Sequence, residues 1–96
     1  MTVEQVRKEL KDVKLYHSSK EFLDDLKENS LVFRIKSNAE KYDILMLGAP
    51  DNLFRLYKAL YVEGKTQSKV ALELSYAKRT VERLHIKLID YCAELL

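Results

Sequence analysis

Apolar residues recur at intervals of three and four near the start of the chain, the spacing that places side chains on one side of an α-helix. They are Val3, Val6, Leu10 and Val13. The residues between them are mostly charged and are expected to face water. The pattern therefore predicts an amphipathic first helix over residues 3–13.

The next helix is predicted from a possible capping box formed by Ser18 and Glu21, whose hydroxyl and carboxylate would satisfy unpaired amides at a helix start. We expect this helix to bury Phe22, Leu23 and Leu26 and to end near residues 29–30. The short apolar run 31–35 fits a helix or an extended connector, since no second strand is available to pair with it.

Residues 37–38, a Ser-Asn pair, are candidates for a break or a new cap, after which Tyr42 and Leu45 continue a helix to Leu47. Gly48-Ala49-Pro50-Asp51 is a strong break, because Gly and Pro interrupt helices. We place the domain boundary there, with an N-terminal helical segment at 1–49, used for packing or oligomerisation, and a C-terminal unit at 50–96.

The periodicity is clearest after Pro50. One helix carries a stripe that consists of Leu53, Leu56, Tyr57, Leu60 and Tyr61. Gly64 is suited to the left-handed conformation that ends a helix, and Thr66 is suited to begin the next one.

We expect a short helix over residues 67–74 and a three-residue turn at 75–77. A last helix follows, with its apolar side at Val81, Leu84, Leu88, Cys92 and Leu95. The C-terminal part of this helix is expected to pack on the N-terminal half, with dimerisation as an additional role.

Composition favours an all-α fold. The 96 residues include only two Gly and one Pro, too few for the many tight turns of a β-sandwich or barrel. Hydrophobic residues make up 47% and charged residues 33%, which is normal for a globular protein. The length suits one modest domain.

The positive charge is concentrated in the second half of the chain. Residues 1–48 contain nine basic and nine acidic residues, whereas 49–96 contain eight and six. Residues 66–88 have a local charge of +3, a small basic patch compatible with phosphate contact. A solvated helix face is the alternative reading of this patch.

Residues 66–88 meet the demands of a helix-turn-helix, in which two helices cross steeply through a turn of three or four residues. Ala71 provides a small residue at the crossing, and the second helix has a polar outer face. The apolar wedge between the helices would be filled by Val70, Leu74, Tyr76, Val81 and Leu84.

Residues 57–88 resemble region four of bacterial sigma factors, and are more similar still to small sigma-like regulators of phages and prophages of low-GC Gram-positive bacteria. The resemblance is carried by Tyr61, Glu63-Gly64, Thr66, Val70-Ala71, Leu74, Thr80-Val81 and Arg83-Leu84. It covers about a third of the chain. It implies a cytoplasmic regulator that binds duplex DNA and acts on transcription, with RNA polymerase as a second candidate partner.

The resemblance implies that the last helix enters the major groove. Arg79 and Arg83 would contact guanine or phosphate, and Glu82 would accept from cytosine. Lys78 and Lys87 would bind phosphates, as would Thr66 at the start of the preceding helix. Two positions depart from the family: Ser75 stands where Gly is common, and Ala77 where Ser is common.

No catalytic or metal-binding pattern is present, so we expect a protein that is not an enzyme and that needs no cofactor. His17, His85 and Cys92 lack the paired spacing of zinc ligands. His85 is expected on a polar helix face, near a phosphate. Cys92 is the only cysteine and is expected in the core, which favours a reducing cytoplasm. No apolar run is long enough to span a bilayer, and the N-terminus lacks the features of a signal peptide.

Two other functions fit the same fold. One alternative is an interaction module that binds RNA polymerase or a sigma factor, and the other is an adaptor similar to the small subunits of phage DNA-packaging machines. Retention of polymerase after nuclease treatment would favour the first of these, and ring-shaped oligomers the second.

Overall fold

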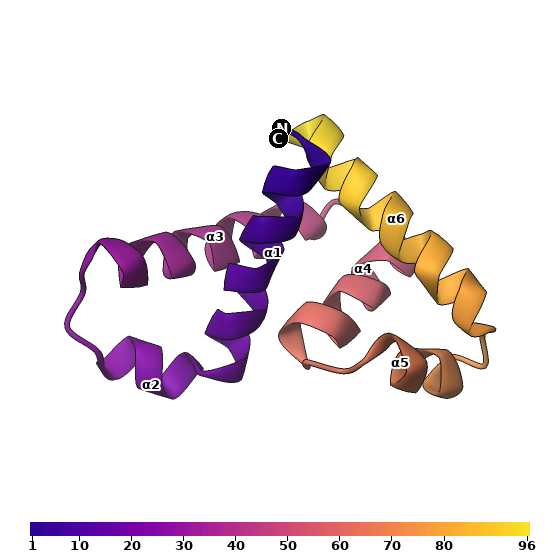
Figure 1. The fold of residues 1–96 in the computed structure, drawn as a ribbon, viewed down its shortest axis with the longest axis horizontal. Coiled ribbons are helices and arrows are strands. Elements are labelled where there is room, and N and C mark those ends of the chain that lie inside the picture. Colours follow the sequence, from indigo (N-terminus) through magenta and orange to yellow (C-terminus); the bar gives the residue numbers. More distant parts are fainter.

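A computed structural model describes residues 1–96 and contains helices but no strands. The prediction of an all-α fold is confirmed. The chain forms a body with extents of 42 × 26 × 21 Å (Figure 1). Its elements are α1 (Val3–Ser18), α2 (Lys20–Asp25), α3 (Ser30–Met46), α4 (Asp51–Tyr57), the π-helix η1 (Lys58–Val62), α5 (Gln67–Glu73) and α6 (Lys78–Leu95). None of these helices is both long enough and apolar enough to cross a membrane.

Helix α1 lies at the centre and contacts α2, α3, η1 and α6. Val6, Leu10 and Val13 are almost completely buried, so the predicted stripe is confirmed. The capping box of this helix is formed by Thr2 and Gln5. The N-terminal ammonium donates a hydrogen bond of 3.2 Å to the carbonyl oxygen of Ala93, which brings the two ends of the chain together (Figure 1).

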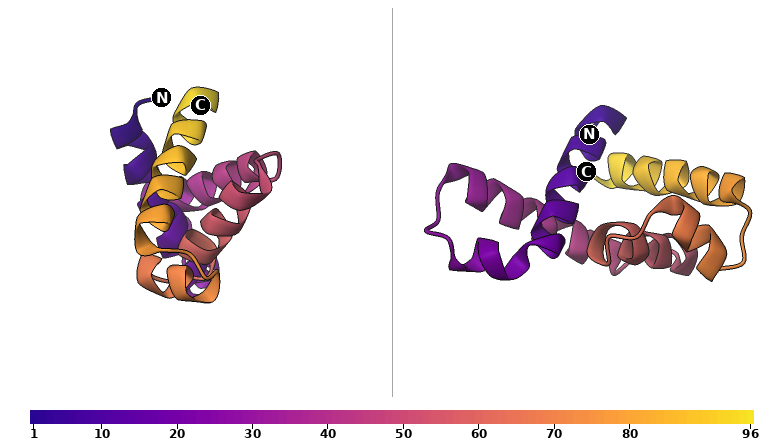
Figure 2. Two further views of the ribbon diagram at one scale, coloured as in Figure 1. Left: turned by 90° about the vertical axis from the view of Figure 1, so that its right-hand side faces the viewer. Right: turned by 60° about the horizontal axis from the view of Figure 1, so that its bottom comes forward.

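One hydrophobic core joins the N-terminal and C-terminal segments. Its fifteen buried residues are Val6, Leu10, Val13, Tyr42, Met46, Leu53, Leu56, Tyr57, Leu60, Val70, Ala71, Val81, Leu88, Ile89 and Cys92. Figure 2 shows the C-terminal helix α6 running beside α4 and α5, with its last turns next to α1. Packing of α6 on the N-terminal half is therefore observed.

The prediction for α2 is wrong in three respects: its cap, its C-terminal end and its buried residues. The Ser18 hydroxyl donates to the carbonyl oxygen of Leu15, and Ser19 occupies the cap position without a side-chain hydrogen bond. The helix ends at Asp25, and only Leu23 is buried, whereas Phe22 is 66% exposed and Leu26 is 38% exposed. A helix of six residues can bury only a narrow side, and here that side is Leu23.

Helix α3 begins after Asn29, whose side chain accepts a hydrogen bond from the amide of Val32. The run 31–35 is therefore helical, and the predicted break at residues 37–38 is wrong. Asn38 lies within α3, is buried, and donates from Nδ2 to Oδ2 of Asp12 at 3.0 Å. This contact with α1 explains why a polar residue occurs in the middle of a packed helix. The predicted break at 48–51 is confirmed.

Helix α4 continues directly into η1, where the amide of Glu63 donates to the carbonyl oxygen of Lys58 at 2.9 Å. The π-helix was not predicted. Gly64 has a φ of 70°, which confirms its predicted left-handed conformation. The amide of Lys65 then donates to the carbonyl oxygen of Ala59, so η1 ends in a closed turn that leads into α5.

Candidate nucleic-acid interface

Helix α5 is short and is fixed at both ends. The Thr66 side chain accepts a hydrogen bond of 3.2 Å from the amide of Lys69, which confirms the predicted cap. Val70 and Ala71 are buried in the core, as predicted. The small side chain of Ala71 lies where α5 and α6 pack together.

The connection from α5 to α6 is a turn with one residue in the left-handed region. Ser75 has a φ of 56°, in agreement with the expectation that a turn conformation favouring Gly falls on this residue. The amide of Tyr76 donates to the carbonyl oxygen of Ala71 at 2.9 Å, and the amide of Ser75 donates to the carbonyl oxygen of Leu72 at 3.3 Å. This pair of bonds is the Schellman motif that ends many helices.

Helix α6 is anchored by its inner side. Val81, Leu88, Ile89 and Cys92 are buried, and Leu84 is partly buried against the same core. Burial raises the pKa of the Cys92 thiol to about 11. The predicted stripe is thus confirmed except for Leu95, which is 57% exposed.

The predicted apolar wedge is only partly formed. Leu74 and Tyr76 are 37% and 43% exposed, so their assignment to the wedge is wrong. Both belong to the turn, where the backbone leaves the helix and no longer directs side chains inward. Of the predicted wedge residues, Val70 and Val81 are buried, and Leu84 is partly buried against the same core.

The predicted DNA-binding residues of α6 all lie on the surface. They are Lys78, Arg79, Glu82, Arg83 and Lys87. None of the five forms an ion pair or a side-chain hydrogen bond within the chain. Arg79, Arg83 and Lys87 are spaced by four residues and therefore share one side of the helix. Thr66, the sixth predicted residue, is also exposed, at the start of α5.

The prediction for His85 is wrong. Its side chain is partly buried and is hydrogen-bonded through Nε2 to the hydroxyl of Tyr61 and through Nδ1 to Nε2 of Gln67 at 3.3 Å. Burial lowers the pKa of His85, and the positive charge of Arg7 lowers it further. His85 thus joins α6 to η1 and α5, and does not belong to the polar face.

A polar cluster that was not predicted joins α1, α3 and α4. Nε2 of His17 lies 2.9 Å from Oδ2 of Asp43, and the Tyr57 hydroxyl donates to Oδ1 of the same carboxylate at 2.6 Å. The three residues are 14 to 40 positions apart, so no sequence motif connects them. Tyr57 is buried, and this contact satisfies its hydroxyl. The cluster holds three helices together.

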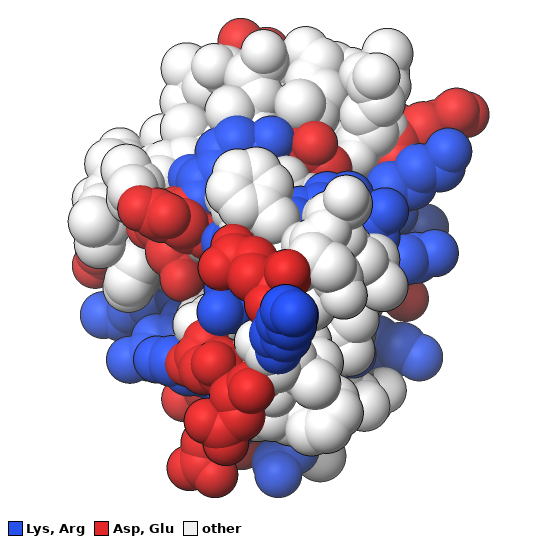
Figure 3. Space-filling view, turned by 90° about the vertical axis from the view of Figure 1, so that its left-hand side faces the viewer, with Lys and Arg blue, Asp and Glu red and all other residues white.

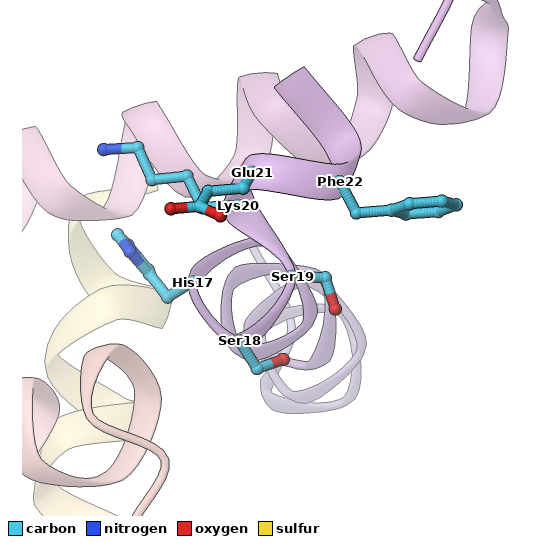
Figure 4. Close-up of a pocket in the computed structure, with 6 residues that line it drawn as sticks. All are labelled: His17, Ser18, Ser19, Lys20, Glu21 and Phe22. Carbon is cyan, nitrogen blue, oxygen red and sulfur yellow. The ribbon is translucent and has the colours of Figure 1, made fainter. Parts of the chain in front are cut away.

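The largest depression, about 590 Å³, is lined by residues 17–22 at the junction of α1 and α2. Figure 4 shows that its side chains do not converge: Phe22 points to the opposite side from His17. No group of three or more His, Cys, Asp or Glu side chains is arranged to hold a metal ion. The exposed basic side of α6 is therefore the strongest candidate for a functional surface.

Comparison with protein families, with curated proteins and with solved structures found no match to this chain. The resemblance to sigma region four thus depends on residues 57–88 alone.

Proposed function

We propose that α5, the turn and α6 act as a helix-turn-helix that binds duplex DNA, and that the protein is a transcription regulator of the phage or prophage type, similar to sigma region four. It would act by binding, without catalysis. The observation that carries the proposal is the exposed side of α6. Four cations there, Lys78, Arg79, Arg83 and Lys87, have no partner within the chain, while the opposite side of the helix is fixed in the core.

The chemistry of these residues suits the two parts of a duplex. Arg79 and Arg83 can each donate two parallel hydrogen bonds to O6 and N7 of guanine, and Glu82 can accept from N4 of cytosine. Lys78 and Lys87 would bind phosphates as point charges, and the Thr66 hydroxyl would meet a phosphate at the other edge of the unit. Because the inner side of α6 is fixed in the core, these side chains would keep a constant position relative to the duplex.

The opposite end of the molecule is less suited to DNA. Acidic and basic side chains lie next to each other on the end formed by α2 and α3 (Figure 3). Several of the cations there are paired, including Lys36 with Asp24 and Arg34 with Asp12. Phosphate groups would meet repulsion as well as attraction on this surface.

In vitro selection of duplex sites by the purified protein tests the proposal. We expect a preferred site, an affinity that falls steeply with salt, and loss of specific binding in R79A/R83A. The matched control is K27A/K58A, which removes two exposed cations, one from the connection between α2 and α3 and one from η1. Unchanged binding by R79A/R83A, or the absence of any selected site, would reject the assigned surface.

A second candidate is an interaction module for an RNA polymerase subunit or a sigma factor. It is favoured by large apolar side chains exposed on α2 and α3, with Phe22 at 66% and Phe33 at 61%. Exposed aromatic residues are common at protein interfaces. Retention of polymerase from a nuclease-treated bacterial lysate by the wild type, and its loss in F22S/F33S, would favour this candidate. If the wild type retains no polymerase once nucleic acid has been removed, DNA binding is favoured.

A further inference from the structure

Charges are segregated on the two flanks of α1. On the flank toward α3, Glu9 accepts hydrogen bonds from Lys41 and Tyr42, and Asp12 accepts from Arg34 and Asn38. The other flank carries three cations, Arg7, Lys11 and Lys14, spaced by four and three residues. All three are exposed and none has an ion-pair partner.

This cationic flank, defined by Arg7, Lys11 and Lys14, lies next to the α5–α6 unit. Lys14 lines a hollow of about 170 Å³ together with Thr66, Gln67 and His85. Arg7 is close enough for its charge to lower the pKa of His85. The start of α1 also lies next to the last turns of α6 in Figure 1 and in the left view of Figure 2.

The acidic groups nearby compensate the three cations only in part. Glu63 and Glu73 lie beside the same hollow, but both pair with Lys65, at 3.3 and 2.7 Å. Glu4 lies on the first turn of α1 and is exposed. Lys65 neutralises only one of these two carboxylates, so the three cations of the flank outweigh the remaining carboxylate and Glu4 by one positive charge.

We propose that Arg7, Lys11 and Lys14 bind phosphate groups of the same duplex, beyond the segment held by α5 and α6. This inference rests on the proposed function and extends its footprint to the N-terminal segment. The occupant is a phosphodiester backbone, because a row of flexible cations without partners complements a row of phosphates and reads no bases. Binding through this flank is therefore independent of sequence.

The test compares R7Q/K14Q with K27Q/K58Q, which has the same change in charge on other surfaces. Dissociation constants are measured against salt for the selected duplex and for a scrambled one. Each phosphate contact contributes about 0.9 to the slope of log affinity against log salt. We expect R7Q/K14Q to lower the slope by about 1.8 and the affinity at low salt by at least about tenfold, for both duplexes. The control and the charge-conserving R7K/K14R should bind as the wild type does.

A second measurement uses the wild-type protein and so does not depend on how any variant folds. Lysine acylation, read by mass spectrometry, should slow at Lys11 and Lys14 when the duplex is bound, and should be unchanged at Lys27 and Lys58. Equal protection at all four lysines would overturn the inference.

The outcomes separate this inference from the proposed function. A wild-type slope in R7Q/K14Q, with binding still lost in R79A/R83A, overturns the role of α1 and leaves the proposed function standing. An equal loss of affinity and of slope in K27Q/K58Q also overturns the role of α1, because the effect would then come from the net charge of the protein and not from this flank. If the wild type binds no duplex, the proposed function and the role of α1 are both rejected. Capture of an acidic protein by the same flank would then indicate a protein partner.

Discussion

The backbone amide of Tyr76 donates a hydrogen bond of 2.9 Å to the carbonyl oxygen of Ala71, and this bond closes the C-terminal end of α5. To form it, the chain passes through Ser75 at a φ of 56°. A residue with a Cβ pays roughly 1–2 kcal/mol in this region of backbone space. The turn that positions the candidate DNA-binding helix is therefore locally strained.

Replacing Ser75 with Gly should relieve this strain. We expect S75G to raise the free energy of unfolding by about 1 kcal/mol, which corresponds to a Tm increase of about 4–8 °C for a domain of this size. Thermal unfolding followed by circular dichroism measures the shift. G64A makes the reverse change at the other left-handed residue. Gly64 has a φ of 70° and open space around an added Cβ, so only the backbone cost applies and Tm should fall. A Tm that S75G leaves unchanged would contradict the assigned strain.

Helix α6 begins without a side-chain cap, because Ala77 occupies the cap position. A77S should supply a hydroxyl that accepts from the amide of Arg79, since the amide of Thr80 already donates to the carbonyl oxygen of residue 77, and it should stabilise the protein by about 1 kcal/mol. The reverse change is available in the preceding helix, where T66A removes an existing cap and should cost a similar amount. Urea unfolding measures both, and equal stability of A77S and the wild type would show that the start of α6 is already satisfied by water.

The contact of Asn38 with Asp12 should be important for joining α3 to α1. Removing a buried hydrogen bond to a charged group costs roughly 1.5–3 kcal/mol, so N38A should lower the free energy of unfolding by about that amount. The adjacent S37A is the control, since Ser37 forms no side-chain hydrogen bond and is less buried. Equal effects of the two variants in urea unfolding would argue against the role of this contact.

His85 should make stability depend on pH. Its pKa in the folded protein lies below the ordinary value of 6.5, mainly because of burial. As pH falls below 6.5, the unfolded chain takes up a proton that the folded protein resists, so the contribution of His85 to stability is complete above that pH and is lost below it. In urea unfolding between about pH 8 and pH 5, H85Q should gain stability relative to the wild type toward acid pH. A difference that is constant with pH would contradict this linkage.

The elements of the C-terminal half were predicted well because their signals are local. Helical spacing, Gly64 and Thr66 each act within a few residues, and the structure has all three as expected. Local signals also misled: Ser18 and Glu21 have the spacing of a capping box, yet Ser18 is the last residue of α1, and Ser19 occupies the cap position of α2 without a side-chain hydrogen bond. The residue at which α2 begins depends on where α1 ends, and the packing of α1 on α3 and η1 decides that end.

The candidate DNA-binding surface was also predictable only where the signals are local. Exposure of Arg79 and Arg83 follows from helical periodicity once Val81 and Leu88 are placed inside. The burial of His85 does not, because its partners Tyr61 and Gln67 are 24 and 18 residues away. Leu74 and Tyr76 were assigned to the interior by hydrophobicity, but the turn directs them outward. The hydrophobic pattern of the sequence does not encode contacts between distant residues or the geometry of irregular backbone, so these features could not be predicted from it.

Cys92 is completely buried, and its sulfur lies 3.9 Å from that of Met46. It is the only thiol in the chain, and it lies where α1, α3 and α6 meet. A thiol reagent can reach it only when these helices separate, so the rate of labelling reports how often the interior opens. The protein thus carries its own reporter of opening: ligands that clamp the helices together should slow its labelling, without any engineered probe.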